Sequence, residues 1–468
     1  MIMKKIETKL YDDFLELFRI NPKAFSHGNS NFVKQQRELS RQNFEANGFP
    51  SNKNENWRKT DLSKALNNNY IIDYQEIERG KETKSLFECE IIDFDTKLFT
   101  ILNGWWASNT DLTSNSQGVI ISSMRKAQLD FPEIFDKYYG KVAKEENGLI
   151  SLNCAFYTDG YFIYIPDNVE FTQTIQIVNL IESQSKLFSN TRNLVVMGRN
   201  SKLKLVHCDD SLSRVDSVVN SVTEIIVGDG ANLDFYKLQN KDEHSTVLTS
   251  NFIEQGANSQ TNSNTITLNG GLIRNHIDVK LAGKGGNANV FGLYLVDKTQ
   301  FVDNHIFVDH AMPNCTSRQL FKGIADDNAK AVFSGHILVR QDAQKTEAYQ
   351  NNNNIQLTDT AGIFTHPFLE IFADDVKCSH GATVGQLDND ALFYMMQRGI
   401  CERTAKMLLM FSFTQQVIEH IQLSKLRERI VHLVTRRLKG ELASCENCAL
   451  SCENPNSVMT FEIDMEKV

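Results

Sequence analysis

A recurring pattern between residues 198 and 331 constrains the fold of this chain more than any other feature. Each occurrence has a polar turn rich in Gly, Asn or Asp, then a small residue, and usually a short run of alternating apolar and polar positions. A repeat of this kind without intervening helices predicts a parallel β-helix, because each coil buries its apolar face only by stacking on its neighbours. The small residues lie at intervals of 30, 26, 31 and 41 positions and are Ser201, Ala231, Ala257, Ala288 and Ala329.

A large antiparallel sandwich is the alternative, since many short strands at regular spacing also fit that architecture. Asn-rich turns such as residues 351–354 favour the β-helix, because Asn tolerates the left-handed backbone that tight corners need. We therefore expect a mainly β protein with a parallel β-helix at its centre.

Helical periodicity replaces the strand pattern at both ends of the chain. Apolar residues recur at helical spacing in residues 7–20 and 32–47, and again in three stretches that begin at Asp388. From about Leu98 to the start of these last helices, the pattern predicts strand after strand. We expect an N-terminal helical domain and linker at 1–95, a β-helix core at 96–386, a C-terminal helical domain at 387–443 and a polar, cysteine-bearing tail at 444–468.

The composition excludes several classes of protein. The chain has nine cysteines, and six of them are scattered singly. An odd and scattered set argues against a disulfide framework. The N-terminus has no apolar stretch of signal-peptide length, and no other stretch is apolar for long enough to span a membrane. We therefore expect a cytoplasmic protein with no membrane partner. The net charge of −9 has the wrong sign for nucleic-acid binding.

Catalytic signatures are missing from the sequence. There is no G-x-x-x-x-G-K-[ST] phosphate loop, no G-x-S-x-G and no H-E-x-x-H. His305 and His310 lie near Asp303 and Asp309, but His310 falls on the opposite strand face from His305 and Asp303. We interpret these histidines as hydrogen-bonded structural residues, and we expect no ATP binding and no enzymatic activity by this chain.

Residues 377–385 hold the strongest candidate for a chemical site. Cys378 and His380 lie two residues apart, so an extended backbone directs both side chains to one face. Thiolate and imidazole suit iron and iron–sulfur centres, and the neighbouring Lys377 is expected to favour the thiolate. Two donors do not complete a four-ligand site, so the remaining ligands must come from elsewhere, most simply from a second subunit. Spacing alone leaves open the alternative of a buried Cys beside a hydrogen-bonded His.

The tail offers a second candidate metal site. Its C-x-x-C spacing is typical of zinc or cluster ligands, and a third cysteine follows. No fourth ligand is evident in the sequence. A metal-binding or redox module there therefore competes with a plain polar tail. The residues concerned are Cys445, Cys448 and Cys452.

Residues 270–415 resemble the SufB/SufD family closely, and the upstream part resembles it more loosely. The form of residues 377–385, Lys-Cys-Ser-His-Gly-Ala-Thr-Val-Gly, is similar to the SufD branch of that family. The close match rests on residues 318–323, 332–339, 343–346, 369–371, 377–386, 392–394 and 398–400 with Gln350, and the looser one on 55–60 and 153–160.

The resemblance implies a right-handed parallel β-helix flanked by helical domains, and a non-catalytic scaffold in iron–sulfur cluster assembly. It implies a complex with a SufB-like subunit and a SufC-like ATPase, with the isolated chain able to form a homodimer. A nascent cluster, transient and shared with the partner, would then have His380 as the firmer ligand and Cys378 as the weaker one. The C-terminal helices would dock the ATPase through Met407, Phe411 and Phe413, which ordinary helix packing explains equally well.

Two other functions compete with this one. A β-helix enzyme acting on polysaccharides shares the fold and would use carboxylates on a coil face. The metal or redox module of the tail predicts stoichiometric metal on the isolated chain.

Overall fold

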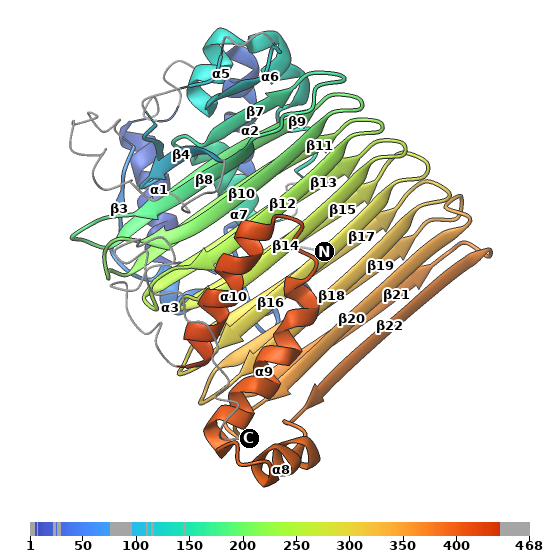
Figure 1. Ribbon diagram of the computed structural model, residues 1–468. Coiled ribbons are helices and arrows are strands. Elements are labelled where there is room, and N and C mark those ends of the chain that lie inside the picture. Colours follow the sequence, from blue (N-terminus) through green and yellow to red (C-terminus); the bar gives the residue numbers. More distant parts are fainter. Residues whose placement is uncertain are drawn as a thin grey trace.

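The computed structural model describes residues 5–6, 8–21, 25, 30–74, 96–108, 111–113, 117–143 and 147–439. Within these residues, two long sheets face each other and extend along most of the molecule (Figure 1). From β7 onward, successive strands alternate between the sheets, and each pairs in parallel with the strand two places later in the chain. This is the parallel β-helix that the repeat predicted.

We name the two sheets after their last strands. The β22 sheet has ten strands in the described residues, and β4 and β5 form its only antiparallel pair. In spatial order they are β22 (Val376–Gly385), β20 (Thr346–Gln356), β18 (Thr316–Ala325), β16 (Asn287–Val296), β14 (Gln260–Asn269), β12 (Asn232–Asn240), β10 (Lys202–Ser211), β8 (Thr174–Ile181), β4 (Thr96–Leu102) and β5 (Trp105–Trp106).

The β21 sheet lies opposite and contains the other strands of the coils. Its order is β21 (Gly362–Ile371), β19 (Lys330–Val339), β17 (Phe301–His310), β15 (Leu272–Leu281), β13 (Ser245–Gln255), β11 (Ser217–Val227), β9 (Leu187–Met197), β7 (Tyr161–Ile165) and β6 (Ile120–Ser123), with β3 (Ile71–Ile72) beside β9. A separate antiparallel pair joins β1 (Lys5–Ile6) and β2 (Phe49–Pro50).

The register of the coils corrects part of the predicted repeat. In the β22 sheet, Lys202 pairs with Asn232 and Asn232 with Gln260, and each later coil adds 27 to 31 residues. Ser201 and Ala231 are therefore equivalent, as predicted. The other three assignments are wrong, since Ala257 lies two residues before Ser259, the true equivalent of Ala231, while Ala288 lies inside β16 and Ala329 belongs to the other sheet. Small residues occur at several positions of each corner, so size alone did not fix the register.

Asn residues do form corners, but not where the sequence suggested. Asn200, Asn258 and Asn314 have positive φ angles of 53°, 53° and 59° and stand just before strands of the β22 sheet. Residues 351–354, predicted as a turn, lie instead within β20. Asn352 is buried there, because its side chain finds Tyr294 and the Phe321 carbonyl inside the coil.

The N-terminal helices share a buried apolar cluster with strands β9, β11 and β13 of the β21 sheet. The helices are α1 (Lys9–Ile20), α2 (Asn31–Asn47), the 3₁₀ turn η1 (Glu55–Trp57) and α3 (Ser63–Leu66). Thr8 and Ser30 accept backbone hydrogen bonds at the starts of α1 and α2, as good N-cap residues do. The helical prediction for residues 7–20 and 32–47 is confirmed.

Three further helices interrupt the region that was predicted to be strands only. They are α5 (Met124–Asp130), α6 (Pro132–Tyr138) and α7 (Gly148–Phe156). All nine residues of α7 are buried, so it has no polar face and its sequence lacks the amphipathic period that reveals a helix. The prediction failed there for that reason.

The C-terminal helices are α8 (Asn389–Gln397), α9 (Glu402–Ile418) and α10 (Ser424–Leu438), as predicted. Figure 1 shows α9 and α10, in red, lying across the outer face of the β22 sheet. Ile418 and Leu433 pack there against Val206 and Leu293, and Arg437 pairs with Asp297 at 2.6 Å. In the described residues, no helix is long and apolar enough to span a bilayer.

Candidate functional site: the last coil of the β-helix

The β-helix ends in an uncovered coil formed by β21 and β22. Each of these strands is the last in its sheet, so one edge of each has no partner strand in the described part of the chain. An exposed strand edge presents unpaired N–H and C=O groups and is a template for pairing with another chain. Large apolar side chains are also exposed on this coil, namely Phe364, Phe368, Ile371, Phe372 and Val384.

Cys378 and His380 lie on β22, in one continuous strand, as the spacing predicted. Cys378 pairs in register with Ala348 and packs, half-buried, against the core between the sheets. His380 pairs with Gln350, whose side chain is buried inside the preceding coil. Because alternate residues of a strand share a face, Cys378 and His380 both belong to the inner face of the last coil. His380 is nevertheless exposed, since no further coil covers it in the described part of the chain.

The environment of the Cys378 thiol differs from the expectation. Burial raises the pKa of Cys378, and a hydrogen bond from the Ala348 backbone opposes this only in part. Lys377 does not favour the thiolate, because its ammonium pairs with Glu347 at 3.0 Å on the opposite face of the strand. In the free chain the cysteine is therefore a thiol at neutral pH, and a metal ion would have to displace its proton.

The pair does not make a complete metal site by itself. Among the residues that the structure describes, no group of three His, Cys, Asp or Glu side chains is arranged to hold a metal ion. A tetrahedral iron or zinc site needs about four ligands.

Gln350, which entered the sequence predictions only as a position of the family match and not as a site residue, lies directly below His380. Gln350 occupies the position that the β-helix register assigns to the imidazole one coil earlier. A repeat of about 30 residues applied backwards from His380 would have found it, since 380 − 350 = 30. A polar residue, Gln350, at a position that faces the apolar core was the signal that could have identified it.

The other predicted site residues lie away from this coil or outside the described residues. Phe411 and Phe413 are half-buried and pack against the β22 sheet, and Lys322 stands over the Phe413 ring at 4.0 Å. Met407 is half-buried and lines a pocket between α8, α9 and β20. The tail cysteines Cys445, Cys448 and Cys452 fall outside the described residues.

The histidines near the two aspartates have structural surroundings. His310 is fully buried on the inner face, with Nε2 2.8 Å from the Ser317 hydroxyl. His305 stacks on His276 on the outer face, with ring centroids 5.4 Å apart. Asp303 pairs with Arg274. The predicted separation of the two histidines onto opposite faces is confirmed.

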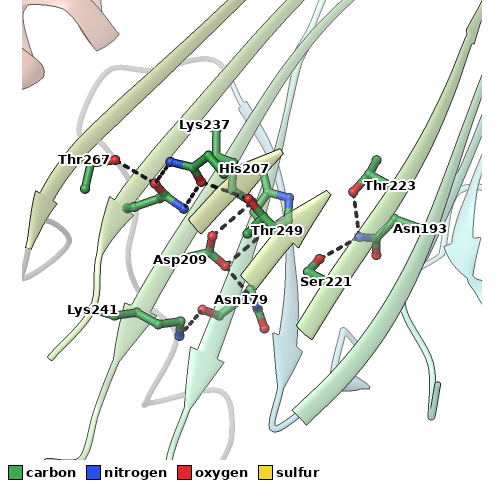
Figure 2. Close-up of polar contacts among 12 residues, drawn as sticks. Asn179, Asn193, His207, Asp209, Ser221, Thr223, Lys237, Lys241, Thr249 and Thr267 are labelled. Atoms are coloured by element: carbon green, nitrogen blue, oxygen red, sulfur yellow. Dashed lines mark hydrogen bonds and ion pairs between the residues drawn. The ribbon is translucent and has the colours of Figure 1, made fainter. Parts of the chain in front are cut away.

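A polar network joins side chains of the earlier coils (Figure 2). Its centre is Asp209, which accepts from Asn179 at 2.8 Å and pairs with Lys237 at 3.0 Å. Asp209 shares a strand face with Leu203 and Leu205, which belong to the same core between the sheets as Cys378. Burial alone would raise the pKa of Asp209, but Lys237 and His207 outweigh it and hold that pKa well below its usual range. These charges are enclosed and mutually paired, in contrast to the uncovered pair on β22.

Comparison with known proteins identifies the family. Residues 179–413 match the model described as "SUF system FeS cluster assembly, SufBD core domain", and residues 8–177 match the SufBD N-terminal region. The chain is similar to a Synechocystis protein named as an iron–sulfur cluster assembly SufBD family protein, with 28% identity over 402 residues, covering 83% of this chain and 87% of the relative.

Two further relatives are named SufD. The protein from Bacillus subtilis is 24% identical over 391 residues, covering 82% of this chain and 88% of its own length. The protein from Escherichia coli is 33% identical over 216 residues, covering 46% of this chain and 51% of its own length. The chain therefore belongs to the SufB/SufD family of the SUF iron–sulfur cluster assembly system and is of the SufD type.

Proposed function

We propose that this chain is a non-catalytic scaffold subunit that pairs through its last coil with a SufB-like subunit, with a nascent iron–sulfur cluster assembled between the two. The observation that carries the proposal is the uncovered edge of β21 and β22, because it brings a polar ligand pair and an unpaired strand edge to the same place. The cluster is the cargo of the complex, held transiently.

The incomplete ligand set supports a shared site. His380 is exposed on the inner face of the last coil, and Cys378 lies two residues before it. A second chain that continues the β-helix across this edge would stack its own first strand on β22 and place its side chains about 4.8 Å from these two. That distance suits a cluster with ligands from both chains.

The C-terminal helices supply the docking surface for a SufC-like ATPase in this proposal. Exposed apolar residues on α8 mark the surface, with Phe393 64% and Tyr394 59% exposed. Met407 lines a pocket with Asn389 and Leu392 of α8, whereas Phe411 and Phe413 are half-buried and pack on the sheet. ATP hydrolysis would then occur in the partner, and this chain would transmit the resulting movement to the last coil.

Co-expression with a SufB-like and a SufC-like protein tests the assembly. We expect a single complex in size-exclusion chromatography, and replacement of Phe372, 58% exposed beside β21, by Asp should release the SufB-like subunit. Leu129→Asp is the matched control, because Leu129 is equally exposed but lies on α5 near the other end of the molecule. A chain that stays monomeric with both proteins present would contradict the proposal.

His380→Ala tests the site within that complex. Because the imidazole is exposed and has no packing role, the three proteins should still assemble while iron and acid-labile sulfide fall. Iron and sulfide at the level of the unaltered complex would remove His380 from the site. Cys378→Ser should have the smaller effect, since the thiol must first lose its proton.

A further inference from the structure

One row of inner-face residues leads directly to His380. Through the β22 sheet, successive coils place Leu205, Phe235, Ser263, Val290, Gln319, Gln350 and His380 in register. Before Gln319 the row holds three apolar residues and the small hydroxyl residue Ser263, and it carries amides only in the two coils below His380. Both amides are buried, with Gln319 2% and Gln350 1% exposed. Buried amides need partners, so their placement here calls for a physical reason.

The Gln350 amide is held in one place. Its Nε2 donates to Gln319 Oε1 at 2.7 Å. On another side it lies against Gly335 of β19, where an added Cβ would come within 2.1 Å of Nε2 and 2.7 Å of Cδ. Gly335 has no side chain, and the Gln350 amide fills the space that this leaves.

One acceptor of this amide is unused. Gln350 Oε1 is buried and has no hydrogen-bond partner among the described residues. Gln319 lies on the side of the earlier coil, and β22 with His380 lies on the other side. A buried carbonyl oxygen without a donor is destabilising, so a donor from the neighbouring coil would be stabilising.

We propose that Gln350 is a positioning residue for His380, with Oε1 accepting a hydrogen bond from one ring N–H of the imidazole. This bond selects one tautomer and orients the ring, so that the other nitrogen faces away from the coil and toward the partner chain. Histidines that bind metals commonly donate their second N–H to a carbonyl or carboxylate in this way. The ligand role of His380 rests on the proposed function, whereas the hydrogen bond would form within this chain alone, by a rotation of the exposed His380 side chain toward the unpaired Oε1.

The first measurement uses the isolated full-length chain with ¹⁵N-labelled histidine. His380→Gln identifies the His380 ring signals by their loss. We expect a single dominant tautomer in the unaltered chain and a mixture of tautomers in Gln350→Met, which keeps the side-chain length and loses the acceptor. Gln350→Glu, which retains an acceptor, should restore a single tautomer. Asn351→Ala is the matched control, because Asn351 is exposed on the opposite face of the same strand.

The second measurement uses the co-expressed complex. Loss of iron to a chelator should be about tenfold faster with Gln350→Met and close to normal with Gln350→Glu and Asn351→Ala, in line with the usual effect of losing such a supporting bond. Circular dichroism and thermal unfolding confirm that each variant is folded before either measurement.

The outcomes separate the two proposals. His380 ring signals that are the same in Gln350→Met and the unaltered chain would overturn the positioning role, as would an equal change in Asn351→Ala. The ring signals could instead respond as expected while iron retention is unchanged by substitution of Gln350 or His380. That result would support the hydrogen bond and overturn the ligand role of His380.

Discussion

The earlier coils and the last coil of the β-helix place polar groups on the same inner face of the β22 sheet but treat them differently. In the earlier coils, Asp209, Lys237 and His207 are buried and interact with one another. In the last coil, Cys378 and His380 have no coil beyond them within the residues that the structure describes. Charges in a closed interior need partners within the chain, because desolvation is costly. Polar groups at an open end remain accessible to another molecule. This difference in accessibility distinguishes the structural network around Asp209 from the candidate binding site on the last coil.

The largest expected effect comes from breaking the enclosed network. Lys237→Met removes the cation that pairs with Asp209 and leaves its carboxylate buried with weaker partners. We expect the free energy of unfolding to fall by about 3 to 5 kcal/mol, the usual result of removing one partner from a buried ion pair. Urea denaturation followed by circular dichroism measures the change.

Lys377→Met is the matched control in the last coil. The ammonium of Lys377 pairs with Glu347 at 3.0 Å, but the pair is exposed to solvent, where such pairs contribute little. We expect no measurable shift of the urea midpoint. Equal shifts in the two variants would contradict the distinction between the enclosed and the open coil.

A second effect should appear in the pH dependence of stability. Burial lowers the pKa of His310 to about 4, although Asp309 opposes the shift. Because the unfolded chain binds this proton near pH 6.5, stability is fully present above that pH. It is lost as the pH falls towards 4, by up to about 3 kcal/mol. His310→Gln should therefore show a smaller loss of unfolding free energy between pH 7 and pH 4.5 than the unaltered chain.

Ser317→Ala controls for the hydrogen bond of His310. This variant removes the hydroxyl 2.8 Å from Nε2 but keeps the titrating imidazole inside the coil. Its overall stability should fall while the dependence on pH persists. If His310→Gln had the same pH dependence as the unaltered chain, the buried imidazole would not be a source of acid instability.

The fold was largely predictable from the sequence, because the turns and alternating strands recur once per coil. The register was not, since Ala257, Ala288 and Ala329 resemble corner residues in composition while pairing shows that they are not equivalent. Helix α7 was not predicted, because a wholly buried helix has no polar face and its sequence therefore lacks the amphipathic period of an exposed helix.

The candidate site was predictable only in part. The shared face of Cys378 and His380 followed from strand geometry, whereas their role as ligands came only as an implication of the family resemblance and stays a prediction. The pairing of Lys377 with Glu347 and the burial of the thiol depend on a strand 30 residues earlier, which local sequence does not reveal. Gln350 was missed as a site residue for the same reason, although the repeat contained the information needed to find it.

The smallest expected effect concerns thiol reactivity, and it tests whether the last coil is as open at Cys378 as at His380. Cys401 precedes α9 and is exposed, and hydrogen bonding from Thr404 lowers its pKa. Cys378 is half-buried with a raised pKa, and burial raises the pKa of Cys208 to about 12. Alkylation by iodoacetamide at pH 7 should be roughly tenfold faster at Cys401 than at Cys378, because the thiolate is the reactive form, and slowest at Cys208.

Mass spectrometry of the three cysteine-containing peptides over time gives these rates in one sample. A rate at Cys378 above that at Cys401 would show an activated thiolate, and it would restore the role that the sequence suggested for Lys377. A rate as low as that at Cys208 would mean that the thiol is closed off by the core, leaving His380 as the only accessible ligand of the pair. The intermediate rate that we expect fits a thiol on the inner face of an uncovered coil, reachable by a partner but not ionised before one arrives.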